Sequence, residues 1–275
     1  MPDLLSGRVA LVTGAANGLG AAIAARLAAA GAAGVALDRD VAGATPPEGW
    51  AAVAADVTDS EALRAAVARC VERYGRLDVV VANAGVVPPW RATEAVDEDE
   101  WDRVSAVNVR GVVATIAAAV PALRAAAATP PPAAASPASG APSAPALPPR
   151  PTASVVALAS VNARKAHPRQ ALYTATKHAV VGVVRATALD LGRDGIRVNA
   201  VAPGSIATDA LLGRMARRAA DGGLPAEEAL AAAAQETALG RIATAEEVAD
   251  AVLFLASDLA SGVTGQVLAV DAGVP

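Results

Sequence analysis

Cysteine and strongly basic segments are nearly absent from this chain of 275 residues. The single cysteine, Cys70, cannot form an internal disulfide, so a reducing compartment is the expected environment. The formal net charge is −4, and no stretch gathers the lysines and arginines that nucleic acid requires. These absences argue against a disulfide-stabilised secreted domain and against a nucleic-acid partner. We also predict no metal site.

Long apolar runs are missing as well, although 54% of the residues are hydrophobic. Alanine supplies much of that fraction. A membrane-spanning helix needs about 18 apolar residues, and charges such as Arg26, Arg124 and Asp250 interrupt the longest candidates. The N-terminus carries Asp3 and no basic segment, and a strand pattern begins by Arg8, which excludes a signal peptide. We therefore expect a cytoplasmic protein with no membrane partner.

Short runs of β-branched residues alternate with longer alanine-rich helical patterns along the chain. Apolar strands separated by helices are typical of a parallel sheet covered on both faces. The sequence thus predicts one α/β domain over residues 1–275, a doubly wound parallel sheet of about seven strands, with helix N-caps at Ser60 and Thr244. The predicted strands are Val9–Val12, Val35–Leu37, Ala52–Ala54, Val79–Ala82, Val155–Ala159, Arg197–Val201 and Gln266–Val270. The predicted helices are Ala21–Ala30, Ser60–Tyr74, Asp97–Ala128, Tyr173–Leu191 and Ala245–Ala256.

Two segments interrupt this alternation. Residues 129–151 hold nine of the nineteen prolines, which excludes a regular helix or strand ladder. We predict a flexible, functionally neutral insertion there, with a partner-docking segment as the alternative. Residues 209–237 lie between a Pro-Gly turn and the next helix cap, and we expect them to form a helical lid over a substrate.

A glycine-rich turn directly follows the first predicted strand and opens the first helix. Its sequence, residues 13–20, is Thr-Gly-Ala-Ala-Asn-Gly-Leu-Gly. Glycines in this position allow a tight turn and a close approach of the backbone to a pyrophosphate, and the helix N-terminus favours negative charge. A purely structural turn is the alternative, which the strand–turn–helix context makes less favourable. The expected cofactor contacts are Gly14, Asn17, Gly18, Leu19 and Gly20.

The end of the second predicted strand carries Asp38, eighteen residues after Gly20. A carboxylate there accepts hydrogen bonds from the adenosine ribose and repels a 2′-phosphate, which favours NAD over NADP. Arg39 complicates this interpretation because an adjacent guanidinium pairs well with a phosphate. NAD is therefore the predicted cofactor, with NADP the less favoured alternative.

The next two strands also end in polar residues. Asp56 and Val57 follow the third strand, where they would reach the adenine or simply form the turn into a helix. Asn83, Ala84 and Gly85 follow the fourth strand and would line the cofactor groove, with a strand-ending turn as the alternative.

Tyr173 and Lys177 stand four residues apart in a chain with only two tyrosines and two lysines. On a helix such residues share one face, and the ammonium is expected to lower the pKa of the phenol toward working pH. Ser160 closes a strand thirteen residues earlier, which would place its hydroxyl in the same crevice. Asn108 lies in a helical stretch, where it would hold a proton-relaying water or mark a helix irregularity.

Together these features resemble those of the short-chain dehydrogenase/reductase family. The resemblance runs from about Gly7 to Gly273 and implies a single Rossmann-type domain that transfers a hydride between nicotinamide and a carbinol carbon. The matching motifs are the Thr-Gly-x3-Gly-x-Gly turn, Asn-Ala-Gly at 83–85, Asn108, Ser160, Tyr-x3-Lys, Pro203-Gly204 and the ending at 263–271.

The family pattern implies a role for each reacting residue. Tyr173 would be the general acid/base and Ser160 would orient the reacting oxygen. Lys177 would bind the nicotinamide ribose and tune Tyr173, and Asn108 would hold the relay water. The other cofactor contacts that the pattern implies are Pro203, Gly204, Ile206 and Thr208. Family members often pair through the helices bearing Tyr173 and Asn108, which implies a homotetramer or homodimer.

Three functions remain open at this stage. The favoured one is an NAD-dependent dehydrogenase or reductase acting on a secondary alcohol or ketone, a small-molecule substrate. An NADPH-dependent 3-oxoacyl or polyketide-type ketoreductase and a non-catalytic dinucleotide sensor or scaffold are the alternatives. Arg214, Arg217 and Arg218 would favour an anionic or acyl-carrier substrate, although a solvated helix face explains such a cluster more simply. The loop residues Arg164, Lys165 and His167 are further possible substrate contacts.

Overall fold

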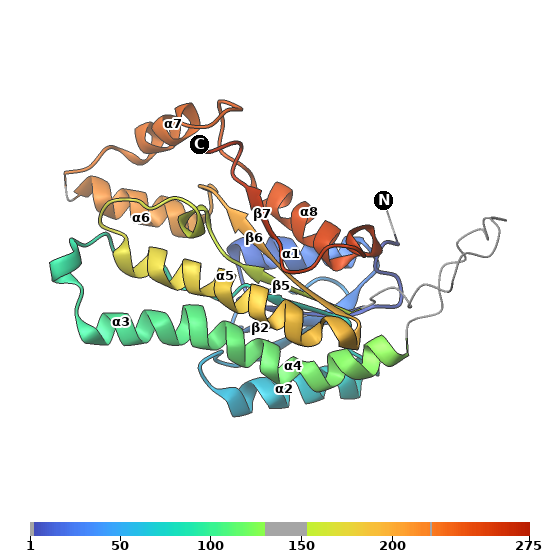
Figure 1. Ribbon diagram of the computed structural model, residues 1–275. Helices are drawn as coiled ribbons and strands as arrows, with labels where there is room; N and C mark the ends of the chain where they lie inside the picture. The colour runs from blue at the N-terminus through green and yellow to red at the C-terminus, as the bar shows by residue number, and fades with distance from the viewer. Residues whose placement is uncertain (1–2, 130–152, 221) are drawn as a thin grey trace.

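One parallel sheet of seven strands forms the centre of the structure (Figure 1). The computed structural model describes residues 3–129, 153–220 and 222–275. The strand order is β3-β2-β1-β4-β5-β6-β7, and every neighbouring pair is parallel, which confirms the predicted doubly wound fold. The strands are β1 (Val9–Thr13), β2 (Ala33–Asp38), β3 (Ala51–Ala54), β4 (Val79–Ala82), β5 (Ala153–Leu158), β6 (Ile196–Pro203) and β7 (Val267–Val270).

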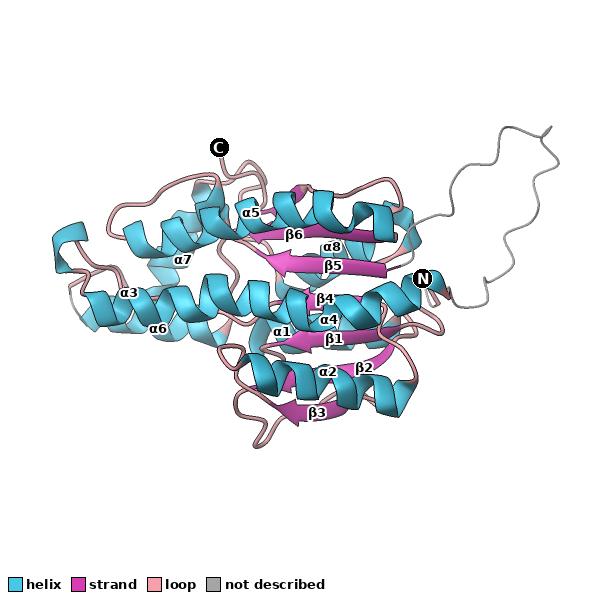
Figure 2. Cartoon of the chain, turned by 60° about the horizontal axis from the view of Figure 1, so that its bottom comes forward, coloured by secondary structure: helices cyan, strands magenta, loops and turns pink. Residues whose placement is uncertain are grey.

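Helices cover both faces of this sheet, as Figure 2 shows from a second direction. The principal helices are α1 (Gly18–Ala29), α2 (Ser60–Tyr74), α3 (Glu98–Ser105), α4 (Gly111–Ala128), α5 (Ala171–Leu191), α6 (Asp209–Ala220), α7 (Ala226–Gln235) and α8 (Ala245–Ala256). One core holds buried side chains of α2, α4 and α5, and the other those of α1 and α8. Because helices bury both sheet faces, the central strands are continuously apolar instead of alternating.

Helix caps agree with the sequence at one predicted position and differ at the other. Thr244 caps α8 in a capping box with Glu247, as predicted. The predicted cap at Ser60 is wrong: Ser60 is the first helical residue and Asp59 is the cap, because its carboxylate accepts hydrogen bonds from the next two free backbone N–H groups.

The predicted helix over residues 97–128 is divided by a π-helical turn, Ala106–Arg110, between α3 and α4. A π turn inserts an extra residue and often marks a functional site. By length and composition alone, the stretch Glu98–Ala128 would be able to cross a membrane. In this structure, Ile116 and Leu123 of α4 are buried in the core against the sheet.

The segments that interrupt the sequence pattern have different outcomes. The predicted insertion, 129–151, lies outside the described residues except for Thr129. The predicted lid, 209–237, is helical as expected and contains α6 and α7.

Asp78 joins the amino ends of three strands. Its carboxylate is fully buried and accepts a hydrogen bond from the Val9 backbone N–H at 2.9 Å. Two further hydrogen bonds, at 2.8 and 2.6 Å, come from the Arg76 guanidinium. The Asp78 backbone also bonds to Val9 of β1 and to Ser154 of β5. Nothing in the sequence pattern marked this carboxylate as structural.

We expect Asp78→Ala to lower the free energy of unfolding by about 3 kcal/mol, because it leaves a buried N–H and a partly buried guanidinium without their acceptor. Urea denaturation would measure the change. Arg124→Ala is the matched control, since it removes a largely exposed ion pair with Asp194 and should cost less than about 1 kcal/mol. Equal losses for the two variants would contradict this account of Asp78.

Candidate active site

The carboxyl ends of the parallel strands bring the predicted site residues to one edge of the sheet. The glycine-rich turn follows β1, Asn83 follows β4, Ser160 follows β5 and Gly204 follows β6. The strand order reverses direction between β1 and β4, and ligands of open α/β sheets bind at such a switch point.

Asn83 braces the glycine-rich turn from the neighbouring strand. Its side-chain amide donates hydrogen bonds to the carbonyls of Thr13, at 2.8 Å, and Gly14, at 3.0 Å. Both turn glycines are needed for close approach: a Cβ on Gly14 would lie 2.9 Å from the Ala84 Cα, and one on Gly20 would lie 2.0 Å from the Gly14 carbonyl oxygen. The predicted groove residues therefore shape the turn itself.

The start of α1 fits a bound pyrophosphate. Gly18 has φ of +53°, and a Cβ there would meet no atom of the described residues within 4 Å. Asn17 precedes the helix but its side chain makes no capping hydrogen bond, and the first turn contains no acidic side chain. The helix N-terminus thus keeps free N–H groups for an anion, whereas α2 and α8 cap theirs.

Asp38 is attached to the same turn. One oxygen of its half-buried carboxylate accepts a hydrogen bond from the Ala16 N–H at 3.0 Å, and the other faces the Asp40 N–H at 3.5 Å. Arg39 is exposed. The turn therefore holds the carboxylate beside the predicted nucleotide path and leaves lone pairs for further donors.

Asp56 and Val57 have local partners. The Asp56 carboxylate accepts hydrogen bonds from the N–H and hydroxyl of Thr58, both at 2.8 Å, and these bonds lower its pKa. Val57 is buried and packs against Gly111. A Cβ added to Gly111 would lie 2.8 Å from the Cγ2 of Val57. This geometry is the helix-entry turn that the sequence left open, and the contact with adenine stays a prediction.

Asn108 lies buried in the π turn, so the predicted helix irregularity is confirmed. Its Oδ1 accepts a hydrogen bond from the Val86 N–H at 2.7 Å, and its Nδ2 donates to the Val86 carbonyl at 2.8 Å. Nδ2 also lies 3.4 Å from the Thr176 hydroxyl. The side chain therefore joins the loop after β4 to α5, one turn from Tyr173.

Three polar groups meet where β5 ends and α5 begins. The phenol of Tyr173, in the first turn of α5, is half-buried and lies near the Ser160 hydroxyl, which favours its ionised form. Lys177 is buried one turn later, and its Nζ donates a hydrogen bond to the Leu158 carbonyl at 2.7 Å. This ammonium lies 5.7 Å from the centroid of the Tyr173 ring. The structure thus brings together Ser160, Tyr173 and Lys177 as the sequence predicted.

The electrostatics correct one expectation. The pKa of Tyr173 is raised above its usual value, because burial disfavours the phenolate more than the Ser160 hydroxyl and the Arg214 cation favour it. Burial also lowers the pKa of Lys177 to about 8. The expected lowering of the phenol pKa by Lys177 is therefore not found in the protein without a cofactor.

The residues after β6 lead from the site into the predicted lid. Gly204 approaches Asp271 so closely that a Cβ would lie 2.9 Å from its Cα. Ile206 is buried and forms an isolated bridge with Ala243. Thr208 precedes α6, and its hydroxyl faces the Leu211 N–H at 3.4 Å.

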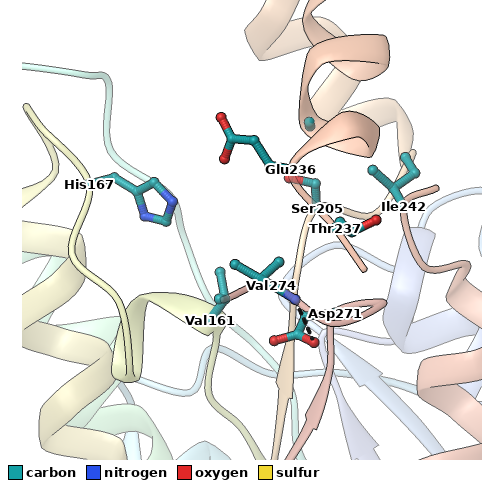
Figure 3. Close-up of a pocket in the computed structure, with 9 residues that line it drawn as sticks. Val161, His167, Ser205, Glu236, Thr237, Ile242, Asp271 and Val274 are labelled. Atoms are coloured by element: carbon teal, nitrogen blue, oxygen red, sulfur yellow. Dashed lines mark hydrogen bonds between the residues drawn. The ribbon is translucent and has the colours of Figure 1, made fainter. Parts of the chain in front are cut away.

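A cavity of about 50 Å³ borders this region (Figure 3). Val161 and Ser205, the neighbours of Ser160 and Gly204 in sequence, line it together with Glu236 of the loop after α7. His167 also faces the cavity, and its Nδ1 is buried without a hydrogen-bond partner among the described residues. Of the predicted loop contacts, Arg164 pairs instead with Asp271 at 3.4 Å.

Asn162 is a site-forming residue that the sequence did not reveal. Its N–H donates to the Ser160 hydroxyl at 3.2 Å, and its Nδ2 donates to Gln170 at 2.8 Å. It thereby fixes the end of β5 against the start of α5. Its position two residues after a strand-ending serine was the only available signal.

The fold and the site define a Rossmann-type oxidoreductase, with a cradle for a dinucleotide beside a Ser-Tyr-Lys group. A family model described as short chain dehydrogenase matches residues 8–129, and one described as enoyl-(acyl carrier protein) reductase matches residues 134–275. The chain belongs to the short-chain dehydrogenase/reductase family.

Individual relatives are similar over almost their full length. The chain is 37% identical to cis-4-hydroxycyclohexanecarboxylate dehydrogenase of Sinomonas cyclohexanicum, over 99% of this chain and 98% of the relative. It is 34% identical to a 3-oxoacyl-(acyl-carrier-protein) reductase of Thermotoga maritima, over 98% of each. Carveol dehydrogenase of Mycobacterium avium, solved in complex with NAD, aligns with a TM-score of 0.84, 32% identity and 99% coverage of both chains. The protein is accordingly an oxidoreductase that acts on hydroxy or keto groups and uses a nicotinamide cofactor.

Lys177 should make the stability of the cofactor-free protein depend on pH. Its pKa is about 8 when folded and 10.5 in the reference state, so the unfolded chain binds more protons between these values. The free energy of unfolding should therefore rise with pH across this window, by on the order of 3 kcal/mol from Lys177.

Denaturation of the wild type and of Lys177→Met between pH 7 and 10 would measure this contribution as a difference. Cys70, whose pKa burial raises to about 12, affects both proteins equally. If the free energies of unfolding of the two proteins change in parallel with pH, the folded-state pKa of Lys177 is not lowered by burial, and the prediction is wrong.

Proposed function

We propose that this chain is an NAD-preferring dehydrogenase/reductase that interconverts a secondary alcohol and a ketone, with Tyr173 as the general acid/base. The observation that carries the proposal is the placement of the Ser160 hydroxyl beside the Tyr173 phenol, at the edge of the sheet where the glycine-rich turn lies. The two hydroxyls can bind one substrate oxygen together, and the phenol, which titrates, can exchange a proton with it.

The cofactor would lie along the carboxyl ends of the strands. When bound, it exchanges a hydride with the carbon that carries the reacting oxygen. Asp38 would accept hydrogen bonds from the adenosine ribose, and the free N–H groups at the start of α1 would bind the pyrophosphate. The remaining contacts proposed for it are Gly14, Asn17, Gly18, Leu19, Gly20, Asp56, Val57, Asn83, Ala84, Gly85, Tyr173, Lys177, Pro203, Gly204, Ile206 and Thr208.

Each reacting residue would act on a proton or hold an oxygen. Ser160 would donate a hydrogen bond to the substrate oxygen while Tyr173 gives that oxygen a proton, or takes one in the reverse direction. Lys177 has ammonium protons beyond the one given to Leu158, and these would bind a ribose hydroxyl. Both side-chain N–H groups of Asn108 have protein acceptors. If Asn108 holds the relay water, the contact would therefore be made by its Oδ1.

The raised pKa of Tyr173 bears on the direction of the reaction. A neutral phenol is a proton donor, which is the form that ketone reduction needs. Alcohol oxidation requires the phenolate, so it should be favoured as the pH rises. Cofactor-bound enzyme at neutral pH would therefore reduce ketones without first losing a proton from Tyr173.

Hydroxy or keto carboxylic acids are the substrate class that we favour, since a relative at 37% identity is named for a hydroxycyclohexanecarboxylate. A 3-oxoacyl reductase is supported by another relative, but the use of NADPH in that alternative is opposed by the carboxylate of Asp38, which would repel a 2′-phosphate. A non-catalytic sensor would have no need of the Ser160–Tyr173 pair. A cytoplasmic location and a homotetramer or homodimer stay predictions.

Tyr173→Phe should reduce kcat by at least about a thousandfold, because no other group at this position can transfer the proton. Cofactor affinity, followed by NADH fluorescence, should change little. Tyr74→Phe is the matched control, since the hydroxyl of Tyr74 is bound to the carbonyls of Gly34 and Gly49 away from the site. Turnover retained by the Tyr173 variant would remove it as the acid/base.

Wild-type protein should bind NADH at least about tenfold more tightly than NADPH, because Asp38 repels the 2′-phosphate. Asp38→Asn should reduce this preference, since it keeps an acceptor for Ala16 but removes the charge. Titration with both nucleotides would measure the ratio, with Asp40→Asn as the exposed control. A wild-type preference for NADPH would favour the ketoreductase alternative.

A further inference from the structure

Helix α6 turns one arginine of the predicted cluster inward. Leu211 and Met215 are buried at 8% and 7% exposure. Arg214 and Arg218 fall on the same helical face, at spacings i+3 and i+7 from Leu211. The guanidinium of Arg218 lies 4.5 Å above the ring of Trp90, in the loop after β4. Arg217 lies off this face and is exposed, as the solvated-face interpretation predicted.

Arg214 has no acceptor in the described part of the chain. Its side chain is half-buried, and its Nε is fully buried without a hydrogen-bond partner. None of the ion pairs among the described residues includes it. A guanidinium left in this state is costly unless an anion completes its hydrogen bonds.

The phenol of Tyr173 lies within electrostatic reach of this guanidinium, and each affects the pKa of the other. Other charged groups near the site are already used or have the wrong sign. Arg164 pairs with Asp271, and the Lys177 ammonium donates to Leu158 and has its remaining protons assigned to the cofactor ribose in the function proposed above. Arg214 is therefore a cation without an acceptor near Tyr173 in the described structure.

We propose that Arg214 binds the carboxylate of a hydroxy or keto acid substrate whose reacting oxygen lies between Ser160 and Tyr173. The inference rests on the function proposed above and names the residue that selects its substrate. Guanidinium and carboxylate form two parallel charge-assisted hydrogen bonds, which fix orientation as well as charge. The lid helix would then be held over the site partly by the substrate itself.

The cavity beside the site supports this placement of the charge. Glu236 lines it, so that side would repel a carboxylate. A substrate with one anionic end and one reacting oxygen would direct the anion toward α6 and leave its apolar part near Val161. The proposed site thus has a positive end at α6 and a negative end at the cavity, which would orient an anionic substrate.

Arg214→Gln, with the exposed Arg217→Gln as its matched control, would test the proposal. The substrates are cis-4-hydroxycyclohexanecarboxylate and its methyl ester, assayed with NAD by nicotinamide absorbance. Loss of the charged pair should lower kcat/KM for the acid by about 10- to 100-fold, chiefly through KM, and change that for the ester by less than about threefold. Arg214→Lys should restore part of the loss, and Arg217→Gln should leave both substrates unchanged.

Equal losses with the acid and the ester, accompanied by a shifted pH profile, would overturn the proposal, because Arg214 would then act only on Tyr173. Unchanged kinetics with the acid would overturn it as well.

A binding measurement separates this inference from the proposed reaction. Cyclohexanecarboxylate carries no oxygen to react at the carbinol position, and calorimetry in the presence of NAD would measure its affinity for each variant. Weaker binding by Arg214→Gln alone would support the carboxylate site even if no alcohol were oxidised. Equal affinity of wild type and Arg214→Gln, or no binding to either, would reject it even if the enzyme were active.

Discussion

The hydrogen bond from the Lys177 ammonium to the Leu158 carbonyl is the contact on which the geometry of the site depends. It joins the middle of α5 to the last residue of β5, and so sets how the helix is rotated about its axis. With that rotation fixed, Tyr173, one turn earlier, faces the Ser160 hydroxyl at the strand end. Burying the charged amine costs stability, and the same burial lowers its pKa to about 8. At this position the protein therefore gives up stability to keep a group that the proposed reaction needs.

The nucleotide half of the site depends on close backbone approach in a comparable way. Asn83 bonds the glycine-rich turn to β4, and Gly14 and Gly20 leave no room for a side chain. Asp38 is attached to the same turn through Ala16. Because the glycine-rich turn, Asn83 and Ser160 follow the neighbouring parallel strands β1, β4 and β5, the sheet register sets the spacing of these strand ends. No flexible element is needed to align them.

The sequence was sufficient for the sheet, and for the grouping of Ser160, Tyr173 and Lys177, because periodicity and strand ends are local signals. It was insufficient for features that depend on contacts between residues far apart in the chain or on the local backbone angles. Asp59 instead of Ser60 caps α2, since two adjacent capping residues compete and only the backbone angles select one. In the π turn, Asn108 bonds to Val86, a residue more than twenty positions away, and the sequence pattern gave no sign of this contact. Asp78, just before β4, carried no signal of its structural role, which depends on Val9 and Arg76.

The pKa of Tyr173 shows why spacing alone does not establish chemistry. The i, i+4 relation to Lys177 is present, yet burial prevails over nearby charge and raises the phenol pKa. The cation that does favour the phenolate is Arg214, which comes from a helix some forty residues further along the chain. If that guanidinium also binds a substrate carboxylate, the bound anion cancels part of its effect on Tyr173, and the phenol stays protonated. Substrate binding would then prepare the acid that ketone reduction requires, so one residue would connect substrate charge to the direction of proton transfer.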